Sequence, residues 1–166
     1  MTPSGFTIPI LASIGNHETG GDRTGADAVF YFLDYFPYYD SSFENDDYLS
    51  VPRDERRHNS LFHSHGFGNL IQFIVLDSGH AITRSSQRGW LTETLQNSTD
   101  FHYRFALYHA PLYPGRRGYH EKSPTDARLQ WGSLFDQYKL TMYVFLNSNL
   151  FFNFLMNFFV QRFRKP

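Results

Sequence analysis

The sequence predicts an α/β fold in which strands and helices pack in layers. Three apolar runs have the length and composition of buried strands, and a turn follows each of them. Segments with helical spacing come after the second and third runs, so strands alternate with helices along the chain. This alternation is typical of α/β layers and not of an all-β protein. The 166 residues are enough for one domain with a sizeable core.

The first two predicted strands are separated by a long stretch that has loop-like, aromatic and charged parts. One strand covers residues 8–14 and ends at Gly15. The other covers residues 69–77, where Leu-Ile-Gln-Phe-Ile-Val-Leu leads into Asp-Ser-Gly. Between them, the charged segment 53–58 is expected to be a surface loop.

A helix and a third strand are predicted next. The helix covers residues 85–95, because Trp90, Leu91 and Leu95 form one apolar stripe at helical spacing. The strand covers residues 103–108 and ends immediately before His109.

The second predicted helix covers residues 123–138. Ser123 is a favourable N-cap, and Pro124 suits the first helical position because its φ is already fixed near the helical value. We expect Leu129, Leu134 and Phe135 to form the buried face of this helix.

The last 25 residues, 142–166, differ in composition from the rest, because they hold seven of the 18 phenylalanines together with several asparagines. Three interpretations are open: a membrane anchor, an amphipathic helix with a polar stripe, or sequence foreign to the domain, such as a retained intron or a shifted reading frame. We favour the third. Four asparagines between residues 147 and 157 make a membrane span costly, so membrane anchoring is not expected.

Overall composition excludes several functions. The chain has no cysteine, which excludes disulfides, a cysteine-ligated zinc site and a thiol nucleophile. The formal net charge of −1, from 15 basic and 16 acidic residues, gives no indication of a nucleic-acid partner. The N-terminal residues do not have the pattern of a signal peptide.

Polar residues follow each predicted strand at its carboxyl end, where ligands bind in open α/β sheets. The first strand is followed by Gly-Asn-His-Glu, the second by Asp-Ser-Gly-His, and the third by His-Ala-Pro-Leu-Tyr. An asparagine carbonyl oxygen and an imidazole nitrogen both suit a first-row metal ion, and a neighbouring histidine can serve as an acid. The candidate residues are Asn16, His17, Glu18, His80, His109 and Tyr113.

Four of these segments resemble motifs of calcineurin-like metallophosphoesterases, specifically of the purple-acid-phosphatase-like branch. Residues 8–18 resemble the Gly-Asn-His-Asp/Glu motif with its strand, and residues 73–80 resemble the central strand with its Leu-Asp-Ser turn. Residues 87–95 resemble the Gln-x-x-Trp-Leu helix, and residues 108–113 the His-x-Pro strand end. The resemblance runs from about residue 8 to residue 141, so we interpret residues 1–141 as a partial metallophosphoesterase domain and 142–166 as a tail of uncertain origin.

The resemblance implies a metal-dependent phosphoester hydrolase and a fragment of a four-layer αββα sandwich. Two divalent or trivalent metal ions, of iron, zinc or manganese, would activate water against a phosphoester substrate. By position, Asn16 and His109 would be ligands of the same metal, and His17 would protonate the leaving alkoxide. Glu18 would orient that imidazole, whereas His80 and Tyr113 are placed in the pocket only by their strand ends. Export from the cell is common in this branch.

Other motifs of the family do not occur in this sequence. Asp-x-His and Gly-Asp normally precede Gly-Asn-His-Glu, and a Gly-His-x-His motif normally closes the site. Residues 100–102 match Asp-x-His but precede their strand, and His63 and His65 are expected on a solvent-facing β-ribbon. We therefore expect a truncated, inactive fragment of the enzyme. The alternative is a degenerate, non-catalytic module that binds a protein partner.

Overall fold

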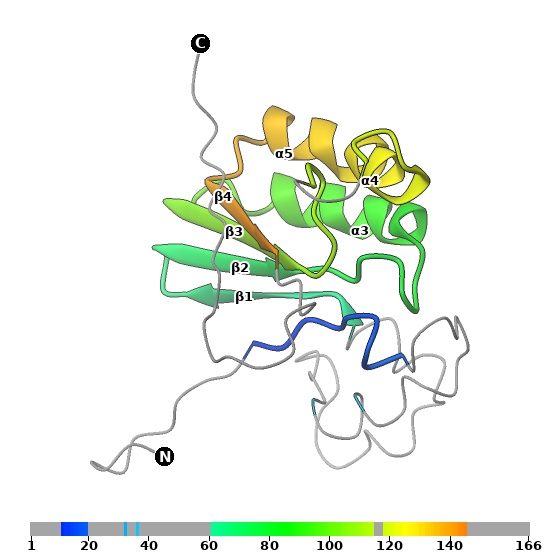
Figure 1. Cartoon of the computed structure of the whole chain (residues 1–166). Coiled ribbons are helices and arrows are strands. Elements are labelled where there is room, and N and C mark those ends of the chain that lie inside the picture. The colour runs from blue at the N-terminus through cyan, green and yellow to red at the C-terminus, as the bar shows by residue number, and fades with distance from the viewer. Residues whose placement is uncertain (1–10, 20–31, 33–35, 37–60, 115–117, 146–166) are drawn as a thin grey trace.

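The computed structural model describes residues 11–19, 32, 36, 61–114 and 118–145, which form a mixed four-stranded sheet with helices on it (Figure 1). The strand order is β1-β2-β3-β4. The first pair is antiparallel and the other two pairs are parallel. The strands are β1 (His63–Phe67), β2 (Ile71–Val75), β3 (Tyr103–Tyr108) and β4 (Met142–Phe145). This arrangement confirms the α/β fold class.

The connections between strands explain these directions. A tight hairpin joins β1 to β2, and its residue Gly68 has a φ of 56°, which glycine adopts without a steric penalty. The parallel pairs need crossovers, and helices supply both of them. Helix α3 (Arg84–Gln96) joins β2 to β3, and a helical stretch joins β3 to β4. In Figure 1 these helices lie together on one side of the sheet.

Helix α3 agrees with its prediction to within one residue at each end. It starts after Thr83, whose hydroxyl accepts a hydrogen bond from the backbone N–H of Ser86. Leu91 and Leu95 are buried, and Trp90 packs edge-to-face on Phe62 with 5.0 Å between ring centres. The apolar stripe is therefore confirmed.

The second predicted helix is present but differs in two respects. Its three consecutive parts are α4 (Lys122–Ala127), the π-helical turn η2 (Arg128–Gly132) and α5 (Ser133–Gln137). The N-cap is Glu121 and not Ser123, so Pro124 is the third helical residue. The expectation for Leu129 was also wrong, because its side chain is 68% exposed.

The buried stripe of this helical stretch explains the error at Leu129. The stripe follows spacings of three and four residues through Pro124, Ala127, Trp131, Leu134 and Phe135. Leu129 lies five residues before Leu134, which places it off this face. Trp131 fills the core position that the sequence analysis gave to Leu129.

The first predicted strand is not a strand in its described part. Residues 11–15 are without regular structure, and residues 8–10 lie outside the described ranges. The Ser13 hydroxyl donates to the carbonyl of Leu76 at 3.2 Å, and this carbonyl lies just beyond the end of β2. This hydrogen bond ties the segment to the end of β2.

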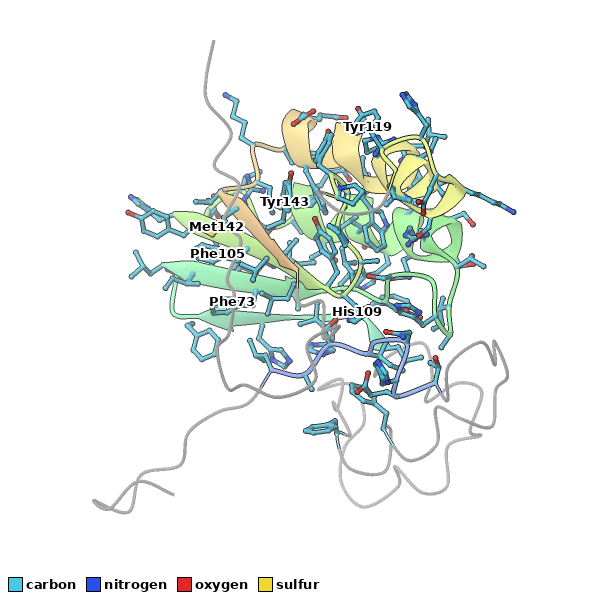
Figure 2. All side chains as sticks on the ribbon, in the orientation of Figure 1. Phe73, Phe105, His109, Tyr119, Met142 and Tyr143 are labelled. Carbon is cyan, nitrogen blue, oxygen red and sulfur yellow. The ribbon has the colours of Figure 1, made fainter. Side chains whose placement is uncertain are left out.

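The two faces of the sheet have different neighbours. On one face, Ile74, Ala106 and Tyr143 lie in register across three strands, are buried, and belong to the core that includes Trp131 of the helical layer. On the other face, which we call the second face, Phe73, Phe105 and Met142 lie side by side (Figure 2). These three residues are half-buried, and the rings of Phe73 and Phe105 stack at 5.4 Å.

Strand β4 consists of the first residues of the range that the sequence analysis assigned to the tail. The sheet therefore extends to Phe145, and residues 146–166 lie outside the described part of the chain, as does the charged segment 53–58. Within the described residues, no helix has both the length and the apolar character needed to cross a membrane.

Candidate functional site

Two of the predicted site residues, His80 and His109, lie together at the carboxyl ends of neighbouring strands. Strands β2 and β3 are parallel neighbours, so His80 and His109 follow strand ends that lie side by side. Their imidazole ring centres are 5.2 Å apart, with 69° between the ring planes. Figure 2 shows His109 beside the N-terminal segment that carries Asn16 and His17.

Gly15 brings the Gly-Asn-His-Glu turn into direct contact with His109. A Cβ atom at this position would lie 2.7 Å from Nδ1 of His109 and 2.9 Å from Oε2 of Glu18. Distances under about 3.0 Å essentially never occur for real Cβ atoms, so only glycine fits here without a shift. The absence of a side chain therefore allows the backbone of Gly15, which directly precedes Asn16, to lie against the predicted metal ligand His109.

Two local hydrogen bonds hold this turn. The Gly15 N–H donates to Oε2 of Glu18 at 2.9 Å, and the Thr19 hydroxyl donates to the carbonyl of Asn16 at 3.0 Å. His17 and Glu18 are exposed, whereas Thr19 is buried. The structure thus gives Glu18 a role in closing the turn, and its predicted role in orienting His17 stays a prediction.

A buried carboxylate organises the loop that carries His80. Asp77 is 0% exposed, and its two oxygens accept hydrogen bonds from four consecutive backbone N–H groups. The donor–acceptor distances are 3.1 Å for Gly79, 2.9 Å for His80, 2.9 Å for Ala81 and 2.6 Å for Ile82. Charge-assisted bonds to backbone N–H groups are among the stronger hydrogen bonds in proteins. The backbone of His80 is therefore fixed.

Gln87 and Ser78 extend this network. The Gln87 side chain accepts from the Asp77 N–H at 3.0 Å and donates to the Asp77 carbonyl at 2.7 Å. The Ser78 hydroxyl oxygen accepts from the N–H groups of His109 at 3.0 Å and Ala110 at 2.8 Å. The Asp-Ser pair after β2 therefore positions both histidines, one from each strand end.

Tyr113 lies in a different environment from the two histidines. Its ring packs against Tyr119 at 6.1 Å between ring centres, and the Arg128 guanidinium lies 5.7 Å from its ring centre. Burial is the main cause that raises the pKa of Tyr113, followed by the charge of Asp136. Arg128 and Asp136 belong to the helical stretch, and Tyr119, labelled in Figure 2, lies in the turn before it. Its place in the pocket stays a prediction.

A second histidine pair lies on β1, on the second face of the sheet. The ring centres of His63 and His65 are 4.9 Å apart. The β-ribbon expected for them is confirmed, but His63 is buried and not solvent-facing, because it packs beside the N-terminal segment near Ala12. Burial, and secondarily the charge of His65, lowers the pKa of His63 to about 3, while a backbone hydrogen bond at Ala12 acts in the opposite direction.

The donor types at the site fit the metals that the resemblance implies. An amide oxygen from Asn16 and an imidazole nitrogen from His109 both suit iron, zinc or manganese, and Gly15, the residue before Asn16, lies against His109. Among the described residues, no group of three His, Cys, Asp or Glu side chains could hold a metal ion. His102 precedes β3 at the end opposite to His109, as expected.

No protein-family model, curated protein or solved structure matches the chain. The resemblance to metallophosphoesterases therefore rests on the sequence motifs.

Proposed function

We propose that the chain carries part of the active site of a metal-dependent phosphoester hydrolase of the purple-acid-phosphatase-like kind. The observation that supports this most directly is the packing of Gly15 on His109. The resemblance to the family implies that Asn16 and His109 are ligands of the same metal, although they are 93 positions apart in the sequence. The close approach at Gly15 brings the backbone beside Asn16 to His109, which is compatible with such a shared role.

The roles at this site follow from the chemistry of each side chain. Asn16 and His109 hold the metal through an amide oxygen and an imidazole nitrogen. Metal ions in such a site lower the pKa of a bound water and stabilise the charge on the phosphoryl oxygens. His17 is exposed on the turn, where its imidazole can reach a bound phosphoester and protonate the leaving alkoxide.

We also propose that the sheet is one half of a four-layer αββα sandwich. Its first face is covered by helices, whereas the second face presents the half-buried apolar row of Phe73, Phe105 and Met142. A second sheet packing on this row would bury it, as in two-sheet architectures. This second sheet would also carry the Asp-x-His and Gly-Asp motifs, whose side chains would bind the metal that Asn16 and His109 do not hold.

We expect low activity from this chain alone. A catalytic metal normally has three protein ligands and a water molecule. The resemblance assigns only two residues of this chain, Asn16 and His109, to a metal. The described residues contain no cluster of three His, Cys, Asp or Glu side chains that could hold one.

The proposal is tested by sequencing the transcript on both sides of this reading frame. We expect Asp-x-His and Gly-Asp before residue 1 and a Gly-His-x-His motif in place of the residues after Phe145, where β4 ends. The protein so defined should hydrolyse p-nitrophenyl phosphate or its diester with dependence on Fe, Zn or Mn, and His17→Gln should reduce kcat. Absence of these motifs from the transcript would refute the enzyme proposal.

The alternative is a non-catalytic module that binds a protein partner. Exposed aromatic side chains on the second face favour it, since Phe67 is 44% and Tyr103 is 45% exposed. Their strands place both residues in register with Ile71, in one row across the sheet. A transcript without the missing motifs would make this module the better proposal.

A further inference from the structure

We infer that His80 is a third ligand of the metal that Asn16 and His109 hold. This inference rests on the proposed function, because it concerns the same metal. It goes beyond the family roles, in which the position of His80 is not assigned to the metal. The observation that carries it is the close pairing of the His80 and His109 rings at the ends of adjacent strands.

The ring geometry fits two imidazoles on one ion. A metal about 2.0 Å from one nitrogen of a ring lies about 3 Å from that ring's centre, so two rings at a tetrahedral angle have centres about 5 Å apart. The centres of His80 and His109 are 5.2 Å apart, and their planes are inclined by 69°. The Nε2 atom of His80 is buried although the residue is half-exposed, so the ring is directed into the protein.

The backbone of both histidines is held in place without a metal. The Asp77 carboxylate accepts the His80 N–H at 2.9 Å, and the Ser78 hydroxyl accepts the His109 N–H at 3.0 Å. Asp77 and Ser78 are adjacent in the sequence and buried, so the backbones of the two histidines are anchored to one short segment. Ligands whose supporting residues are fixed in this way lose little freedom when they bind a metal.

The resulting donor set is two imidazole nitrogens and one amide oxygen. With a water molecule it completes the four positions of a catalytic zinc-type site. Nitrogen-rich sites of this kind favour Zn²⁺, Co²⁺ and Fe²⁺ over Mg²⁺ and Ca²⁺, which prefer oxygen ligands. With His80, the metal that Asn16 and His109 hold would have three protein ligands in place of two.

The test is metal titration of the full chain at about pH 7. Co²⁺ is followed by its ligand-field absorption and Zn²⁺ by calorimetry, with Mg²⁺ as the comparison. The variants are His80→Gln, His80→Phe and His109→Gln, and Phe is included because it keeps ring packing but has no nitrogen. His102→Gln is the matched control, since His102 is exposed at the opposite end of β3. Circular dichroism without metal shows whether each variant folds.

We expect one Co²⁺ or Zn²⁺ per chain at this site, and a loss of affinity of at least about 100-fold in both His80 variants and in His109→Gln, because removing even an outer partner of a ligand costs about 10- to 100-fold. The His102 control should bind as the parent chain does. A double His63→Gln, His65→Gln variant identifies any ion bound at the pair on β1.

If His109→Gln loses the metal and both folded His80 variants retain it, the inference is wrong and the proposed function stands. If the parent chain binds neither metal at this site, the inference is wrong, whereas the proposed function is decided separately by the motifs in the transcript.

Discussion

Replacing Asp77 with asparagine should strongly destabilise the fold. The two carboxylate oxygens accept hydrogen bonds from four backbone N–H groups, with N···O distances of 2.6 to 3.1 Å. An asparagine has one amide oxygen, and its NH₂ group would face two N–H donors. Two hydrogen bonds are lost, and bonds to a charged group contribute about 1.5–3 kcal/mol each. We therefore expect Asp77→Asn to lower the free energy of unfolding by about 3–6 kcal/mol.

This loss is a large share of the stability of a typical domain, which is about 5–15 kcal/mol. Urea unfolding measures it, with the fluorescence of Trp90 and Trp131 as the signal. Asp100→Asn is the control, because Asp100 is exposed and a surface substitution usually changes stability by less than about 0.5 kcal/mol. If Asp77→Asn costs no more than Asp100→Asn, the carboxylate does not organise the loop that carries His80.

Three further predictions follow from the same packing. Gly15→Ala should weaken Co²⁺ binding at least about 10-fold, because its Cβ would lie 2.7 Å from Nδ1 of His109; titration with Co²⁺ measures this, and unchanged affinity would contradict it. His63 has an ordinary pKa of 6.5 and a folded-state pKa of about 3, so the unfolded chain binds a proton first as the pH falls. Stability should therefore be highest above pH 6.5 and should decrease toward pH 3, by up to about 5 kcal/mol from this residue. Urea unfolding across this pH range should show that the free energy of unfolding depends less on pH in His63→Leu than in the parent chain. The same pH dependence in both would show that His63 is not the residue responsible. Trp131→Ala should cost about 3–5 kcal/mol in thermal or urea unfolding, and Leu129→Ala should cost less than about 0.5 kcal/mol. Equal costs would contradict the packing of this helical stretch.

The elements that the sequence predicts well are those with a strong local pattern. The third strand matches β3 residue for residue, and the helix before it matches α3 to within one residue at each end. Both have regular apolar spacing between clear turn residues, so neighbouring positions alone determine them. The sequence does not show that the helix before β4 contains a π-helical turn. Leu129 is misplaced for a different reason: the buried stripe runs through Ala127, Trp131 and Leu134, and Leu129 does not lie on it.

The N-terminal segment shows a different limit. Its apolar run fits a buried strand, but in the described residues one side-chain bond from Ser13 to Leu76 takes the place of backbone pairing. Whether an apolar segment joins a sheet depends on which partner edge is free, and that is decided by residues far away in the sequence. The pattern therefore locates a buried residue, Ile14, but not the secondary structure around it.

The sequence predicts the side chains of the candidate site, but it does not predict the buried residues that hold the loops of the site in place. Asn16, His80 and His109 follow predicted strand ends, and the structure pairs the two histidines and packs the turn of Asn16 on His109. Asp77 and Gln87 were noted only as parts of family motifs, although an acidic residue that ends an apolar strand before Ser-Gly is a signal for a buried loop anchor. The path of the loop decides which backbone N–H groups donate hydrogen bonds to the Asp77 carboxylate, and the sequence does not show this path.

The distribution of polar groups around this site supports a functional role for the loop after β2. Burying a carboxylate carries a penalty of several kcal/mol, and hydrogen bonds must offset it. The fold buries Asp77 where its four bonds fix the segment containing His80, and it buries Ser78 where its hydroxyl holds the backbone of His109. A loop needed only as a connection could be capped by an exposed side chain at much lower cost, as Thr83 caps α3. The buried pair instead holds the backbones of two histidines beside each other, an arrangement that agrees with the metal site proposed above.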